Sequence, residues 1–172
     1  GTPTGQPGTP SQRDKDIAKL RDPKTSDAEK KELLKKYPND KSARAAYNMG
    51  RLGKLDPANR KKVMEQYKDT KYGDKFKKEY DLQRLRDPSV PRAEKDKILE
   101  KYKGSDFGKK LQHIDDIRKL KDPKTTTAER EKISQKYKGT KLATNVERAN
   151  DLAKLRNPKL SQAEREKIEK KY

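Results

Sequence analysis

Tyrosines recur along this chain at an almost constant spacing, with lysines beside them. The gaps are 30, 35, 35 and 35 residues, between Tyr37, Tyr67, Tyr102, Tyr137 and Tyr172. Tyrosine rings can stack on the bases of a single-stranded nucleic acid. Each of these tyrosines, however, follows a leucine, valine or isoleucine by four residues, which places both side chains on one face of a helix. The pattern therefore favours packing between adjacent units, with the hydroxyl directed to water.

The lysines are the stronger candidates for binding, because ammonium groups attract phosphates as point charges. If equivalent positions line up in stacked units, they form rows of positive charge that follow a phosphate backbone. The alternative is that these lysines stabilise helix C-termini and keep the surface soluble. The candidate contacts with a polyanion are Lys35, Lys36, Lys101, Lys103, Lys124, Lys136, Lys138, Lys159, Lys170 and Lys171.

Aspartates also recur, each with a lysine or arginine three residues later. They are Asp16, Asp81, Asp116 and Asp151, and the second copy has Arg51 at this position. Each lacks a second ligand at metal spacing within its unit, so the pattern predicts surface ion pairs and no metal site. The single histidine, His113, occurs in one copy only, and we expect it on an exposed or partly buried helix face. The chain has no cysteine and no recognisable catalytic set, so we predict no catalytic residue, no cofactor and no enzyme activity.

These residues sit on a repeated pair of predicted helices. The first helix should end before Pro23, Pro88, Pro123 and Pro158, because proline cannot continue a helix and restricts the residue before it. The second helix should begin with capping boxes at Ser26, Thr126 and Ser161, each followed by a glutamate three residues later. In the second copy Asp56 and Pro57 replace this start, and in the third copy Pro91 predicts a weaker cap.

The segment after each tyrosine is equally regular. Residue types that tolerate a left-handed exit come two positions later, at Asn39, Asp69, Gly104 and Gly139. Cap formers for the next helix follow, at Asp40, Thr70, Ser105 and Thr140. Small residues that let two helices approach closely come six positions after the tyrosine, at Ala43, Gly73, Gly108 and Ala143.

We therefore predict an all-α fold of about five two-helix hairpins of 35 residues, arranged as a solenoid or as a string of bundles. Only 27% of the residues are hydrophobic, so the core should be a thin seam. The predicted repeats are 11–37, 38–67 with a short loop, 68–102, 103–137 and 138–172, after a flexible Thr/Pro/Gly linker at 1–10. Besides the five tyrosines, the predicted core contains Leu33, Ile98, Ile133, Ile168, Leu52, Leu82, Ile117 and Leu152.

The charge of the chain favours a binding function. It has 47 basic and 28 acidic residues among 172, a net charge of +19. We expect a non-enzymatic module that binds the backbone of DNA or RNA with little sequence preference, or an acidic protein surface. There is no apolar run of transmembrane length and no tryptophan, so we expect no membrane insertion.

The alternative is a structural or protein-interaction spacer within a larger secreted, surface or virion protein, in contact with other modules of the same longer chain. The Thr/Pro/Gly segment and the tandem copies favour this hypothesis. The chain has no initial methionine, so we expect either a fragment of a longer protein or a processed product. A continuous basic face would favour nucleic acid. Lysines scattered evenly among acidic residues would favour the spacer.

Overall fold

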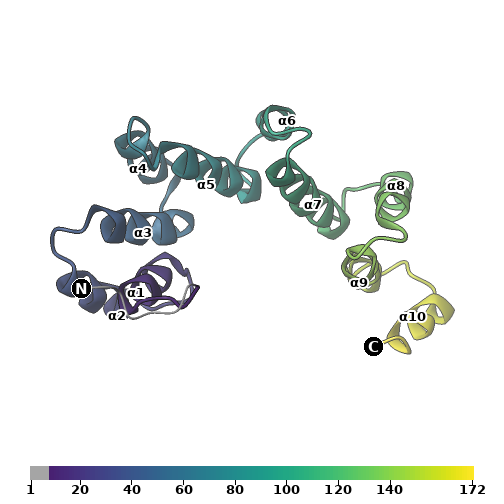
Figure 1. Ribbon diagram of the computed structural model, residues 1–172. Coiled ribbons are helices and arrows are strands. Elements are labelled where there is room, and N and C mark those ends of the chain that lie inside the picture. Colours follow the sequence, from purple (N-terminus) through teal and green to yellow (C-terminus); the bar gives the residue numbers. More distant parts are fainter. Residues whose placement is uncertain (1–7) are drawn as a thin grey trace. The chain divides into compact units, whose positions relative to one another are not determined.

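The protein is all-α over the residues described by the computed structural model, 8–172. This part of the chain contains ten α-helices, one short 3₁₀ helix and no strand (Figure 1). The predicted all-α class is therefore confirmed. Residues 1–7 of the predicted linker lie outside the described residues.

The chain divides into two compact units, one ending at Asp87 and the other running from Pro88 to Tyr172. The first contains α1 (Gln12–Arg21), α2 (Asp27–Lys36), α3 (Lys41–Arg51), η1 (Leu52–Lys54), α4 (Pro57–Tyr67) and α5 (Gly73–Arg86). The second contains α6 (Arg92–Lys101), α7 (Asp106–Lys121), α8 (Thr127–Tyr137), α9 (Ala143–Leu155) and α10 (Gln162–Glu169). The division falls between α5 and α6, within the predicted third repeat.

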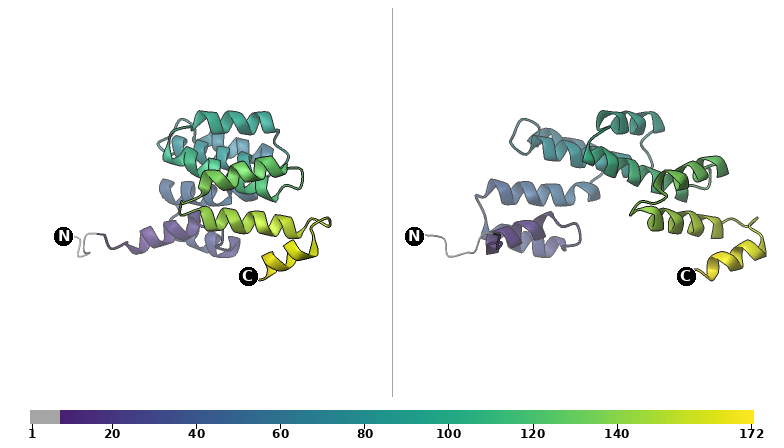
Figure 2. Two further views of the ribbon diagram at one scale, coloured as in Figure 1. Left: turned by 90° about the vertical axis from the view of Figure 1, so that its right-hand side faces the viewer. Right: turned by 45° about the vertical axis from the view of Figure 1, so that its right-hand side comes forward.

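Within each unit, a long helix packs against the next long helix along the chain. In the first unit α1 packs against both α2 and α3, and α4 packs against α5 (Figure 1). In the second unit α7 and α8 both pack against α9, and short connections join these helices (Figure 2). Each unit is thus held together by contacts between helices that are close in sequence.

Most of these helix ends lie at the predicted proline and capping positions. The helices α1, α5 and α7 each end one residue before an aspartate that precedes a proline. The hydroxyl groups of Ser26, Thr126 and Ser161 all accept a backbone N–H at the start of the next helix. Of these three residues, only Thr126 also donates its backbone N–H to the side chain of the glutamate, Glu129. The other two predicted capping boxes therefore have only one of their two hydrogen bonds. Pro91 makes no side-chain cap, as expected.

The exits after the tyrosines differ from the prediction in two of four copies. Gly104 and Gly139 have φ of 86° and 77°, whereas no described non-glycine residue has a positive φ, so Asn39 and Asp69 do not adopt the left-handed conformation. The side chains of Asp40 and Ser105 cap the following helices as predicted.

Thr70 and Thr140 do not cap the following helices. Their hydroxyl groups donate to the carbonyls of Tyr67 and Tyr137, and α5 and α9 begin three residues later, at Gly73 and Ala143. The predicted helix starts are therefore wrong in these two copies. Ser105 makes the same bond to the carbonyl of Tyr102 and still caps α7, so this bond alone does not account for the difference.

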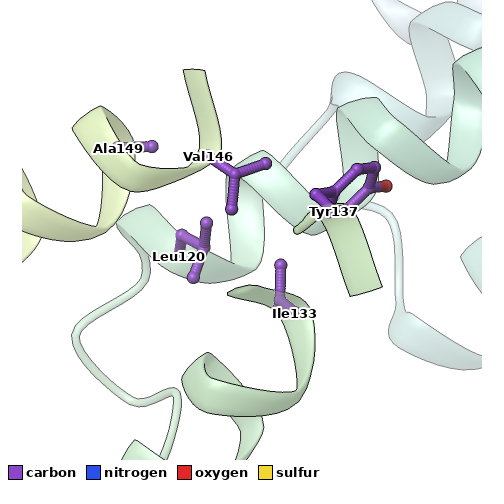
Figure 3. Close-up of a cluster of buried hydrophobic side chains, with 5 residues drawn as sticks. All are labelled: Leu120, Ile133, Tyr137, Val146 and Ala149. Carbon is purple, nitrogen blue, oxygen red and sulfur yellow. The ribbon is translucent and has the colours of Figure 1, made fainter. Parts of the chain in front are cut away.

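Small apolar clusters form the core. In the first unit one cluster joins Leu20, Leu33, Ala43 and Ala46, and another joins Ala45, Met49, Tyr67 and Phe76. In the second unit Leu120, Ile133, Tyr137, Val146 and Ala149 meet, with the Tyr137 hydroxyl pointing away from the apolar carbons (Figure 3). Ile98, Ile168, Leu52 and Leu82 are also buried, as predicted.

Two residues that we predicted to be buried in the core are exposed. Leu152 is 45% exposed and Tyr172 is 56% exposed. The ring of Tyr137 belongs to a buried cluster with Val146 of the following helix, whereas the ring of Tyr172 lies beside the guanidinium of Arg148, 5.4 Å from the ring centroid. Leu52, by contrast, lies in η1, which packs against α5. Tyr37, Tyr102 and Ile117 are half-buried.

Candidate functional site

The repeated tyrosines and aspartates are partners across the hairpins. The hydroxyl of Tyr37 donates to Asp16 Oδ2 at 2.5 Å, and that of Tyr137 donates to Asp116 Oδ2 at 2.5 Å. In the last hairpin the Tyr172 hydroxyl donates to Asp151 Oδ2 at 2.9 Å. The prediction that the tyrosine hydroxyls face water is therefore wrong for these three residues.

The aspartates are buried. The prediction that they lie on the surface is therefore wrong. Asp16, Asp116 and Asp151 are at most 4% exposed. A buried carboxylate needs hydrogen-bond donors, and the tyrosine supplies one. The hydrogen bond from Tyr37 lowers the pKa of Asp16 and raises the pKa of Tyr37. Burial, together with the bond to Asp116, raises the pKa of Tyr137.

The second copy replaces this pair with a different one. Asn48 Nδ2 donates to the Tyr67 hydroxyl at 2.7 Å. The Tyr67 ring also stacks on Phe76 with a centroid separation of 4.1 Å. The hydroxyls of Tyr37, Tyr67 and Tyr137 thus bond to other residues of the protein while their rings pack in its core clusters, which disfavours the use of these rings as base platforms.

Several of the predicted binding lysines form ion pairs with acidic residues. Lys136 Nζ lies 2.6 Å from Asp116 Oδ2, and Lys171 Nζ lies 3.1 Å from Asp151 Oδ2 and 2.8 Å from Glu147. Lys35 Nζ lies 2.7 Å from Glu32. Lys101 Nζ lies 5.0 Å from the centroid of the Tyr102 ring. An external phosphate would have to compete with these carboxylates for the three paired lysines.

The other predicted lysines are exposed and form no ion pair within residues 8–172. They are Lys36, Lys103, Lys124, Lys138, Lys159 and Lys170. They do not form one cluster. Lys124 is the member that lies in a groove with other cations.

That groove has a volume of about 850 Å³ and lies wholly within the second unit. The end of α7, the connection to α8, the first turns of α8 and the end of α9 form its walls. Four exposed cations line it, none of which forms an ion pair within the described residues: Lys121, Lys124, Lys154 and Arg156. Glu131 is the one carboxylate of its lining, so the groove is strongly positive.

A fifth cation, Arg130, supports the groove wall. Its guanidinium donates to the backbone carbonyls of Leu120, Asp122 and Thr125, with lengths of 2.7 Å and 3.3 Å for the last two. The last carbonyls of a helix have no partner within the helix, so this arginine caps the end of α7. It also fixes the connection that carries Lys124.

This cation recurs, and the sequence analysis missed it; Lys30, Arg60 and Lys95 are buried, whereas Arg130 and Arg165 are partly buried. Arg165 donates to the carbonyls of Leu155 and Asn157, and Arg60 donates to those of Leu52 and Leu55. A basic residue stands seven positions before each repeated tyrosine, at Lys30, Arg60, Lys95, Arg130 and Arg165. The signal was therefore in the spacing, but a basic residue in so charged a sequence does not reveal that it is buried.

A second hollow on the other side of the α7–α8 connection has mixed charge. It measures about 490 Å³, and Asp116, Asp122 and Glu129 lie among its lysines and Arg92. Nearby, the fully buried Asp115 is held by Arg92 at 3.0 Å and by Lys119 at 3.4 Å. The excess of positive charge is therefore larger in the 850 Å³ groove, where five cations accompany one carboxylate, than in this hollow, where five cations accompany three.

An unpartnered acceptor also belongs to the basic groove. Asn150 lines it, and the Oδ1 atom of this residue is buried without a hydrogen-bond partner. His113, which is half-buried, packs its ring against Tyr137 with a centroid separation of 5.5 Å. Its Nδ1 likewise lacks a partner.

No protein-family model, no curated protein and no solved structure matches the chain. Within residues 8–172, no three or more acidic, histidine or cysteine side chains come together as a potential metal site. None of the described helices is long and apolar enough to cross a membrane.

Proposed function

We propose that this protein is a non-enzymatic binding module whose partner is a polyanion, with the backbone of DNA or RNA as the first choice. The observation that carries the proposal is the groove of the second unit, where Lys121, Lys124, Lys154 and Arg156 converge without partner carboxylates. Four cations around one concave surface give a positive potential that attracts phosphates from a distance. Contacts of this kind read charge and not base sequence.

We also propose that the ten helices are five copies of one hairpin of about 35 residues. Two relationships support this interpretation. The Tyr–Asp hydrogen bonds join residues 21 positions apart in three hairpins. The arginine seven residues before the tyrosine, buried or partly buried, contacts the end of the preceding helix in the second, fourth and fifth hairpins. The boundaries at 37/38, 67/68, 102/103 and 137/138 follow from this spacing.

A structural or protein-interaction spacer is the second candidate, and one observation favours it. Lys136 and Lys171, both predicted as phosphate contacts, instead bind buried aspartates of their own hairpins. Such lysines serve folding and solubility. In this alternative the basic groove would contact an acidic protein surface.

The test measures the affinity of the whole chain for a fluorescent single-stranded oligonucleotide as a function of salt. Four phosphate contacts predict a slope of about −3 in a plot of log affinity against log salt concentration. That slope is a loss of about 50-fold between about 50 mM and about 200 mM salt. Failure to bind any nucleic acid at the lowest salt would refute the proposal and leave the spacer.

A pair of variants localises the binding. The double variant Lys121→Gln/Lys154→Gln removes two groove cations, so the salt slope should become shallower by about 1.4. The matched control, Lys109→Gln/Lys110→Gln, removes the same charge from two exposed residues of α7 that do not line the groove. If both variants change the slope equally, binding follows net charge and does not use the groove.

A further inference from the structure

The fifth hairpin has the same internal contacts as the fourth but a different environment. In both hairpins the repeated tyrosine donates its hydroxyl to an aspartate, and the lysine before the tyrosine approaches the same carboxylate. The second helix is thus held against the first in the same way. The exposure of the tyrosines differs, however, because Tyr137 is 9% exposed and Tyr172 is 56% exposed. The cause of this difference therefore lies outside the hairpin.

Helix α9 buries the outer face of the fourth hairpin. Leu120, Ile133 and Tyr137 of that hairpin form one apolar cluster with Val146 and Ala149 of α9 (Figure 3). The cluster therefore shows what kind of surface covers a hairpin of this type. It is the face of a helix with apolar residues three positions apart.

The corresponding face of the fifth hairpin is open. It consists of Leu152, Leu155 and Tyr172, which we call the end face. Leu152 is 45% exposed and Leu155 is half-buried, whereas Leu120, the equivalent of Leu155 in the fourth hairpin, is fully buried. Apolar side chains that gather on an exposed surface mark a site of interaction with another molecule.

Arg148 does not take the place of a covering helix. Its guanidinium lies 5.4 Å from the centroid of the Tyr172 ring. His113 occupies the equivalent position in the fourth hairpin, with its ring 5.5 Å from that of Tyr137. Tyr137 nevertheless packs with Val146 as well. A tyrosine of this type therefore accommodates a side chain of its own hairpin and a helix from outside at the same time.

The helix that follows each repeated tyrosine in the sequence has the same pattern. A small residue comes six positions after the tyrosine, and an apolar residue comes nine positions after it. The four pairs are Ala43 with Ala46, Gly73 with Phe76, Gly108 with Leu111, and Ala143 with Val146. Seven of these eight residues are buried, and only Ala143 is half-buried. The small residue allows the close approach, and the apolar residue fills the seam.

We propose that the end face binds an amphipathic helix of another protein, with alanine or glycine followed three residues later by a bulky apolar residue. This inference does not depend on the proposed binding of polyanions. The end face continues an interface that the protein already makes between its own hairpins, and the partner helix would repeat the contacts of α9. The contact is apolar, so salt should weaken it little.

The first helix of a second copy does not meet this requirement. The residues of α1 and its start that correspond to the pattern of α9 are Gly8, Ser11 and Asp14. All three are exposed, and Ser11 is the N-cap of α1. A polar outer face of this kind caps an array of repeats and disfavours head-to-tail association of copies. The partner is therefore a different polypeptide.

The experiment titrates the whole protein with a synthetic peptide of residues 139–157, which contains the sequence of α9. A side-chain bridge between positions 144 and 148, on the side away from the pattern, holds the peptide helical. The methyl resonances of Leu152 and the ring resonances of Tyr172 should shift and saturate, with a Kd of about 1 mM or below. A peptide with Val146→Asp, and a peptide of residues 8–21, should leave both resonances in place.

A variant of the protein locates the contact. Leu152→Lys should bind the peptide about 10-fold more weakly or worse, because one apolar side chain leaves the interface. The residue is exposed, so the fold should persist. Gln135→Lys adds the same charge at an exposed position of α8 and is the matched control. Both variants should still bind an oligonucleotide if the proposed function is correct, so the two proposals fail separately.

Three results would overturn the inference. The first is the absence of any saturable shift, or equal shifts with the peptide that carries Val146→Asp. The second is dimerisation of the unchanged protein in sedimentation, lost in Leu152→Lys, which would assign the end face to a second copy. The third is a shift of the same resonances with phosphatidylcholine vesicles but not with the peptide, which would assign the end face to a lipid surface.

Discussion

The hydroxyl of Tyr137 donates a hydrogen bond to the buried carboxylate of Asp116 across the fourth hairpin, at 2.5 Å. Lys136 approaches the same carboxylate oxygen at 2.6 Å, and Gln112 donates to the other oxygen at 3.0 Å. The aspartate is thus surrounded by donors from both helices. The contact ties α8 to α7 and removes Lys136 from the set of cations that face a ligand.

Replacement of Tyr137 by phenylalanine should destabilise the second unit by about 1–2 kcal/mol, because it leaves a buried carboxylate with one donor fewer. Urea denaturation measures the change in free energy of unfolding. Tyr172→Phe is the matched control, and its effect should be smaller because Tyr172 is 56% exposed. An equal effect of the two substitutions would contradict the importance of burial at Asp116.

Lys30 should be a source of instability in the first unit. It is fully buried, and its Nζ has no hydrogen-bond partner. The arginines at the equivalent positions, Arg60, Arg130 and Arg165, reach the carbonyls of the preceding helix. Lys30→Met removes the unsatisfied group and should stabilise the protein by about 1–3 kcal/mol. A loss of stability in urea denaturation would show that the ammonium has a partner in solution.

The same residue predicts a dependence of stability on pH. Burial, with a smaller contribution from the charge of Lys54, lowers the pKa of Lys30 below its ordinary value of 10.5. Between the lowered pKa and the ordinary one, the unfolded chain binds more protons than the folded protein. Stability should therefore rise with pH across that interval. This rise in stability with pH should be absent from Lys30→Met. The difference between the free energies of unfolding of the two proteins, measured at a series of pH values, therefore isolates the contribution of Lys30.

Asp40 should make the first unit sensitive to acid. A hydrogen bond from Arg13, together with backbone N–H donors at the start of α3, lowers the pKa of Asp40 to about 2. Because the folded pKa lies below the unfolded one, the stabilisation is complete at neutral pH. It is lost as pH falls from about 4 to about 2. In Asp40→Asn this part of the acid transition should disappear, which circular dichroism at a series of pH values can measure. Identical acid profiles for the two proteins would contradict the assignment.

Gly108 should not tolerate a side chain. A Cβ atom there would collide with the backbone carbonyl of Tyr102. Although alanine normally favours a helix over glycine, Gly108→Ala should lower stability by about 1–3 kcal/mol, because the clash is with backbone and not with a movable side chain. Gly53→Ala is the comparison, since its Cβ would meet only the end of the Gln83 side chain. A thermal midpoint that rises in Gly108→Ala would contradict the predicted close approach.

Sequence patterns were most reliable where the physical cause is local. Proline positions marked the ends of α1, α5 and α7, and Thr126 capped α8 as its sequence required. These features depend on a few neighbouring residues, whose backbone groups lack partners at a helix end. The prediction failed at Thr70 and Thr140, whose hydroxyls donate to the carbonyl of the preceding tyrosine and accept the N–H groups of Tyr72 and Leu142, which lie before the following helices.

The candidate site could be predicted only in part. The sequence indicated that cations matter and included Lys124, but it placed Lys124, which follows Asp122-Pro123, and Lys136, which precedes Tyr137, in the same set of candidates. The two differ because Lys136 points toward Asp116, which another helix supplies, whereas Lys124 lies on a connection between helices. Lys121, Lys154 and Arg156 join it only because the ends of α7 and α9 are brought together.

By itself, the sequence determined that this protein is made of helices, approximately where each one begins and ends, and that its charge is strongly positive. These properties follow from the order of residues along the chain and from their sum. The tertiary structure alone decided that the tyrosine hydroxyls bind aspartates, that Leu152 is exposed, that a repeated cation is buried or partly buried, and which lysines remain accessible. The reason is that a side chain's partner depends on the rotation and approach of packed helices, which a period in the sequence does not specify.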